Sequence, residues 1–99
     1  MNSFLLTEAA DADLDEIWAF VAGSTSPEAA DRLEDALYQS FRKLARTPQI
    51  GHARADLAPD RVAFYTVHSI MIAYLPATRP LQVIRVLHGA RDIRPLLEE

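Results

Sequence analysis

The stretch Val83-Ile84-Arg85-Val86-Leu87-His88-Gly89-Ala90-Arg91-Asp92, near the end of the chain, decides the fold and the candidate site. It begins as an apolar strand, which Arg85 and His88 interrupt. A strand that is buried on both faces has no use for either side chain, because charged groups are costly to bury. The stretch therefore predicts a β-sheet that keeps one face available for binding or catalysis.

Working outward from this stretch, the second half of the chain is typical of strands. Apolar and β-branched residues predict strands at 61–67, 70–75 and 81–87, and a shorter one is predicted at 3–6. The links between the last three strands are short, so these strands should be antiparallel neighbours. Residues 49–60 hold proline, glycine and aspartate without a clear period and are expected to form an ordered loop. A short turn or helix is expected after the last strand.

The first half of the chain is typical of helices. A helix is predicted over residues 8–22, with Thr7 as its N-cap and Gly23 ending it. Its apolar residues fall at helical spacing and form one stripe: Ala10, Leu14, Ile17, Trp18 and Val21. Trp18 on this stripe is expected in the core.

A second helix is predicted over residues 27–46. Thr25 and Glu28 have the spacing of a capping box, and Thr47-Pro48 should stop the helix. The connection between the helices is short, so they should form an antiparallel hairpin. Helices and strands are segregated along the chain. The sequence therefore predicts one α+β domain over residues 1–99, with a helical hairpin packed on a mostly antiparallel sheet.

Regular alternation assigns the last strand's residues to two faces. Ile84, Val86 and His88 should point one way, and Val83 and Arg85 the other. Neither face is plainly polar. The helical hairpin accounts for one face, and the other is left to the loop, to the C-terminal segment or to a partner.

Composition narrows the class of protein. The 99 residues are 49% apolar and 24% charged, with a net charge of −4. Residues 1–50 carry −5 and residues 51–99 carry +1, and every base in the second half is arginine, which suits carboxylates and phosphates. The field is weak for nonspecific binding of nucleic acid. The chain has no cysteine and no apolar run of the ~20 residues that a membrane span needs, so a cytoplasmic location without membrane contact is expected.

No metal or cofactor is expected. The histidines lack metal-ligand spacing: His52, His68 and His88. The acidic run of the first helix lacks the glycine and final glutamate of a calcium loop and is expected on a solvated helix face: Asp11, Asp13 and Asp15.

Four pieces, in this order, resemble the ParE branch of the RelE/ParE toxins. They are Asp13-Leu14-Asp15-Glu16-Ile17-Trp18, Ser26-Pro27-Glu28-Ala29-Ala30, Pro48-Gln49-Ile50-Gly51, and Arg85-Val86-Leu87-His88-Gly89-Ala90-Arg91-Asp92. The resemblance covers nearly the whole chain, and the last piece is the most specific.

The resemblance implies the toxin of a type II toxin–antitoxin system. ParE-like members are associated with poisoning of DNA gyrase and with plasmid stabilisation, and no hydrolytic site is ascribed to them. A ParD-like antitoxin, commonly with a ribbon-helix-helix half, would wrap the toxin, so that DNA is contacted only through the antitoxin. The acidic balance departs from the basic character of many such toxins.

Two alternatives stay open. A RelE-like mRNA endonuclease would use His88 as general base, with Arg61, Arg85 and Arg91 holding phosphate. A decayed toxin would keep only antitoxin binding. In a regular strand Arg85 and His88 face apart, which favours a binding edge over a catalytic pair. The candidate functional surface is Arg61, Arg85, His88 and Arg91, and a structural role at the strand end is an equal interpretation of His88.

Overall fold

The computed structural model describes residues 3–88, so the predictions that concern Arg91 and a C-terminal turn or helix lie outside the described residues. The elements in chain order are β1 (Phe4–Leu6), α1 (Glu8–Ser24), α2 (Pro27–Arg46), a 3-10 turn η1 (Pro48–Ile50), β2 (His52–Ala53), β3 (Ala63–Val67), β4 (Ile70–Leu75) and β5 (Leu81–His88).

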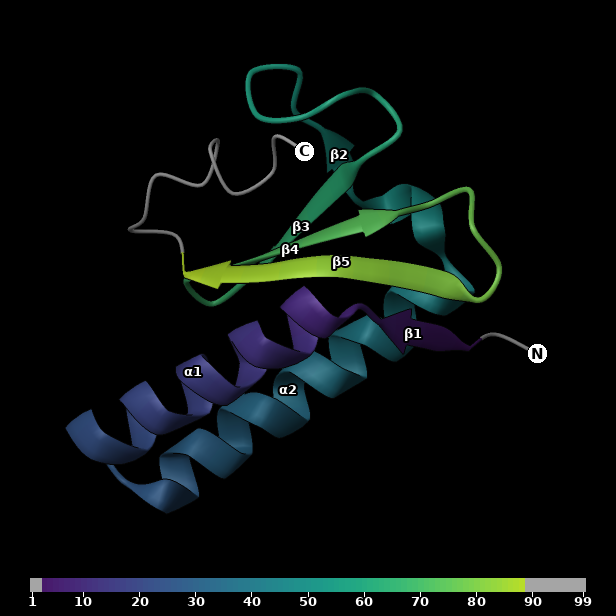
Figure 1. Ribbon diagram of the computed structural model, residues 1–99. Helices are drawn as coiled ribbons and strands as arrows, with labels where there is room; N and C mark the ends of the chain where they lie inside the picture. The colour runs from purple at the N-terminus through teal and green to yellow at the C-terminus, as the bar shows by residue number, and fades with distance from the viewer. Residues whose placement is uncertain (1–2, 89–99) are drawn as a thin grey trace.

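The strands form one mixed sheet in the order β1-β5-β4-β3-β2. Only the β1–β5 pair is parallel, and the other pairs are antiparallel. α1 and α2 form a hairpin that packs on one face of this sheet (Figure 1). The predicted α+β class and the mostly antiparallel sheet are confirmed.

The helix ends follow the local sequence, with two corrections. The Thr7 side chain accepts a hydrogen bond from the Ala10 N–H at 3.1 Å, which confirms the predicted N-cap. α1 continues through Gly23, which has no positive φ and so does not form the left-handed cap that was expected. Ser26, not Thr25, caps α2, because its hydroxyl accepts from the Ala29 N–H at 3.0 Å.

The expected loop at 49–60 contains regular structure that the prediction missed. The 3-10 turn η1 overlaps its start, and β2 adds an edge strand to β3. Both are anchored by Tyr74, whose buried hydroxyl donates to the Pro48 carbonyl at 2.6 Å and accepts from the Gly51 N–H at 3.0 Å. A Cβ on Gly51 would collide with that hydroxyl and lie 2.8 Å from the Phe64 carbonyl oxygen, so the chain needs glycine at this close approach.

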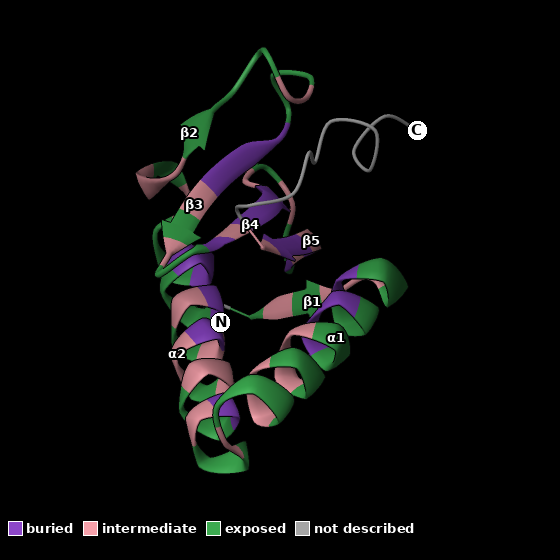
Figure 2. Ribbon diagram, turned by 90° about the vertical axis from the view of Figure 1, so that its left-hand side faces the viewer, coloured by how far each residue is buried: buried purple, intermediate pink, exposed green. Residues whose placement is uncertain are grey.

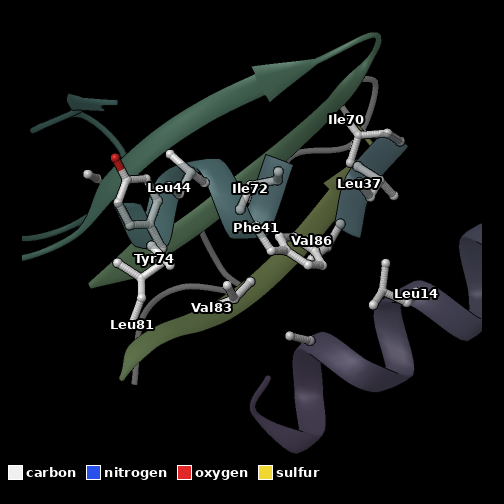
Figure 3. Packing of buried hydrophobic residues seen from close by; sticks show 13 residues of the cluster. Leu14, Leu37, Phe41, Leu44, Ile70, Ile72, Tyr74, Leu81, Val83 and Val86 are labelled. Atoms are coloured by element: carbon white, nitrogen blue, oxygen red, sulfur yellow. The ribbon is translucent and has the colours of Figure 1, made fainter. Parts of the chain in front are cut away.

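The main core lies between the helical hairpin and the sheet (Figure 3). Val83 and Val86 both belong to it, although they are three residues apart in β5. The cause is an irregularity in the β4–β5 ladder, where Ala73 pairs with Arg85 and Tyr74 pairs with Val83. This β-bulge leaves Ile84 as the extra residue. The predicted alternation of β5 is therefore broken at Ile84, and residues 85–88 alternate regularly after the break.

The opposite face of the sheet carries a smaller apolar cluster of Val62, Phe64, Ala73 and Leu87. Leu57 and Ala58, from the loop after β2, pack against it. The buried residues of β3, β4 and β5 and the exposed outer surfaces of both helices can be followed in Figure 2. The loop thus covers part of the second face, and it is one of the covers that the sequence predicts for this face.

Candidate functional site

The candidate site lies along the edge of β5 that β1 leaves uncovered. β1 pairs with β5 only as far as Val83, and α1 then follows the strand (Figure 1). At the start of this edge, Thr7 donates from its backbone N–H to the Val83 carbonyl at 3.1 Å and from its hydroxyl to the Ile84 carbonyl at 2.9 Å. α1 therefore takes the place of a longer edge strand.

Six residues further along the chain, in α1, Asp13 accepts hydrogen bonds from the same strand. Its carboxylate accepts from Nε and Nη2 of Arg85, both at 2.8 Å, and from the Val86 backbone N–H at 2.9 Å. The Asp13 side chain is 5% exposed and that of Arg85 is 19% exposed. The prediction of a solvated face for Asp13 is wrong, because this carboxylate satisfies a backbone donor that the short β1 cannot reach.

The second part of the site is a hollow between α1 and the end of β5. Its volume is about 260 Å³, and its lining residues are Asp13, Glu16, Ile17, Phe20, Val86 and His88. The rings of Phe20 and His88 meet edge to face, with centroids 6.2 Å apart. Phe20 is 64% exposed, so a large aromatic surface is presented at the rim of the hollow. Such a surface is suited to an apolar contact with a protein partner.

Arg85 and His88 lie on opposite faces of β5, as the sequence predicts, because the ladder is regular from Arg85 to His88 and pairs them with Ala73 and Ile70. Arg85 reaches Asp13 and His88 reaches Phe20, so both side chains end against α1. Their contact points are seven residues apart, which is about 10 Å along a helix. The two side chains therefore flank one surface without forming a hydrogen-bonded pair with each other.

The other predicted residues are not brought to this surface. Arg61 is exposed just before β3. The register puts Ala63 opposite Tyr74, at one end of the sheet, and His88 opposite Ile70, at the other end. Arg91 lies outside the described residues.

Sequence reasoning missed Phe20 and Asp13. Phe20 could have been found, because it is the one large apolar residue of α1 that the buried stripe leaves out. Asp13 carried no local signal of burial, since its partners are 72 and 73 residues away.

Acidic side chains from both helices lie around Tyr38. Burial raises the pKa of Tyr38 above its ordinary value, and the nearby charges of Glu34, Asp11 and Asp15 raise it further. Trp18 donates from its indole N–H to Asp31 at 2.9 Å and joins the two helices. Trp18 is half-buried between the two helices and belongs to neither apolar core cluster, so the prediction that it lies in the core is not confirmed.

Within residues 3–88, no group of three or more His, Cys, Asp or Glu side chains could hold a metal ion. In the same part of the chain, neither helix has the length and apolar character needed to cross a membrane.

Together, the hairpin, the sheet order and the α1-covered edge of β5 define a small α+β domain with the RelE/ParE fold. The family model described as the ParE toxin of type II toxin–antitoxin systems, parDE, matches residues 4–93. This chain belongs to that family. A solved chain of the chromosomal ParDE TA system from P. aeruginosa is similar in fold, with a TM-score of 0.75 and 22% identity. The match covers 89% of this chain and 96% of that one. No curated protein matches the sequence.

Proposed function

We propose that this ParE-type toxin acts by binding proteins in the bacterial cytoplasm, with DNA gyrase as its target. A cognate ParD-like antitoxin of the ribbon-helix-helix class would neutralise it by folding over the sheet and the helical hairpin. In this proposal the toxin contacts DNA only through the antitoxin.

The observation that carries the proposal is the state of Arg85. An endonuclease needs cations that are placed to bind a phosphate while charge develops on it. Here the guanidinium already donates two hydrogen bonds to a buried carboxylate, so it fastens β5 to α1. Arg61 precedes β3, at the end of the sheet opposite to the end where His88 lies. His88 faces the Phe20 ring. These placements favour contact with a protein over hydrolysis of RNA.

The proposed contact surface is centred on Phe20 and His88. It joins an exposed aromatic ring, a hollow and a polar rim, as hot spots of interfaces do. Arg85 would act on this surface through Asp13, as a positioning residue. Arg61 and Arg91 remain proposed members of the wider functional surface.

The test is induction in a bacterial host, alone and together with the small gene adjacent to this one. We expect growth arrest alone, rescue by the second gene, trapped gyrase–DNA complexes and intact transcripts. Cleaved transcripts with unaffected gyrase would instead establish the RelE-like endonuclease. Normal growth, combined with a stable complex with the antitoxin, would leave the decayed toxin as the surviving interpretation. Normal growth with no complex would refute the proposal entirely.

A further inference from the structure

A second hollow lies between α2 and β3, with β4 and β5 separating β3 from the edge where α1 runs. Its volume is about 470 Å³. Three of its lining side chains are cationic and none of the residues named here is acidic: Ala36, Gln39, Ser40, Arg42, Lys43, Arg46, Tyr65 and Val67. A groove of one charge sign in a chain of net charge −4 is a local feature and needs its own explanation.

Helix stability explains only part of this cluster. Lys43 and Arg46 lie in the last turn of α2, where cations favour the helix dipole. Arg42 lies before the last turn of α2, so the helix dipole does not explain its position. The Lys43 Nζ lies 3.4 Å from the Tyr65 hydroxyl oxygen and 5.8 Å from the centre of the Tyr65 ring. Among the ion pairs of the described residues, none includes any of these three cations.

The groove runs beside a free stretch of strand edge. Of the described strands, only β2 flanks β3 on this side, and it pairs no further than Phe64. Val67 and Ile70 close the two-residue turn that joins β3 to β4. Alternation in an antiparallel ladder then directs the N–H and C=O of Thr66 away from β4, toward the open edge. An edge of this kind accepts an added strand.

We propose that the groove between α2 and β3 binds an extended, acidic peptide segment. The segment pairs with Thr66 through its backbone and directs alternate side chains toward Arg42, Lys43 and Arg46. The two-residue repeat of a strand sets the pattern of the ligand, with carboxylates at every second position. Duplex DNA fits less well, because three cations in an acidic chain make a small electrostatic footprint. The inference is independent of gyrase and of the α1–β5 surface.

The test uses the full chain and a short labelled peptide in which glutamate alternates with threonine. Fluorescence anisotropy gives the affinity, and NMR shifts locate the peptide. We expect shifts of the amides of Thr66 and Lys43. A peptide with lysine in place of glutamate should not bind. A peptide methylated on alternate backbone nitrogens should bind much more weakly, and neither of these changes alters the protein.

On the protein, Arg42→Glu should weaken binding by about tenfold, as expected when a partly exposed attraction becomes a repulsion. Arg32→Glu changes the net charge equally on an exposed part of α2 outside the groove, and it should weaken binding by less than about twofold. Equal effects of the two variants, undiminished binding of the methylated peptide, or no binding at all would overturn the proposal. Tighter binding of a DNA duplex with shifts at the same amides would do so as well.

Discussion

The carboxylate of Asp13 in α1 holds the guanidinium of Arg85 in β5 by two hydrogen bonds of 2.8 Å and also accepts the Val86 N–H at 2.9 Å. One buried acid thus satisfies both a charge and a backbone donor on the strand edge that β1 leaves uncovered. Removing the Asp13 carboxylate takes away two hydrogen bonds of a largely buried guanidinium and the acceptor of the Val86 N–H, which is far more costly than losing an exposed ion pair.

Asp13→Ala is therefore expected to lower the free energy of unfolding by about 3–5 kcal/mol. Asp13→Asn should cost less, because the amide oxygen can still accept from Val86. Urea denaturation measures both. Asp15→Ala, at an exposed position of the same helix, is the matched control and should change stability by less than about 0.5 kcal/mol. The double variant Asp13→Ala/Arg85→Ala should cost less than the sum of its single variants, and strict additivity would contradict the proposed coupling.

The same pair shows what could be predicted from the sequence. α2 and β4 have the predicted bounds because their signals are local: a proline-led start and a Thr-Pro stop for the helix, and an apolar run between turns for the strand. Asp13 was placed in solvent because nothing near it in sequence reports its burial. Its environment depends on β1 ending at Leu6, so that α1 closes the edge of β5.

The candidate site was predicted in part for a related reason. The sequence predicts that Arg85 and His88 face apart, and the register confirms this, but which of the two shares a face with Val83 could not be predicted. The bulge at Ile84 appears only when β4 and β5 are paired, since it is a mismatch of register between two strands. A single strand read alone contains no sign of it.

Phe20 and Leu5 offer a matched pair for testing the proposed contact surface. They are the two large exposed hydrophobic residues of the described chain, at 64% and 55% exposure. Neither Phe20→Ala nor Leu5→Ala should change stability by more than about 0.5 kcal/mol. Phe20→Ala should weaken binding to the cognate antitoxin or to gyrase by at least about 2 kcal/mol, the scale of an interface hot spot.

Isothermal titration calorimetry measures these affinities, and growth arrest in the induction experiment gives a second readout. Leu5→Ala should leave both unchanged. If Leu5→Ala is as damaging as Phe20→Ala, or if neither affects binding, the surface lies elsewhere on the molecule.

Two glycines should respond to alanine with opposite signs. Gly51→Ala drives a methyl group into the Tyr74 hydroxyl and toward the Phe64 carbonyl, and neither can yield without breaking the anchor of η1. A loss of roughly 2 kcal/mol or more is expected. Gly23 is helical, and apart from its chain neighbours and the nearby backbone of its own helix, a Cβ there would meet no atom within 4 Å. Gly23→Ala should therefore raise stability by up to about 1 kcal/mol. Denaturant midpoints of both variants, measured side by side, decide whether these signs hold.

Tyr74 should make stability depend on alkaline pH. Burial raises the pKa of its hydroxyl above the ordinary value of 10.0, the charge of Tyr65 raises it further, and the hydrogen bond from Gly51 lowers it. A raised pKa in the folded state means that the neutral hydroxyl stabilises the protein fully below pH 10, and that this contribution is lost as the pH rises through the folded pKa. Tyr74→Phe removes the donor to Pro48 and leaves the Gly51 N–H without its acceptor, so it should cost about 1–3 kcal/mol at pH 7.

The Tyr74→Phe variant should also lose less stability than the parent chain between neutral and strongly alkaline pH. Denaturation curves recorded across that range compare the two slopes, with Tyr38→Phe as a control for a tyrosine whose pKa is also raised but which does not bond η1. Equal slopes for the parent chain and Tyr74→Phe would show that the hydroxyl does not titrate as a buried group.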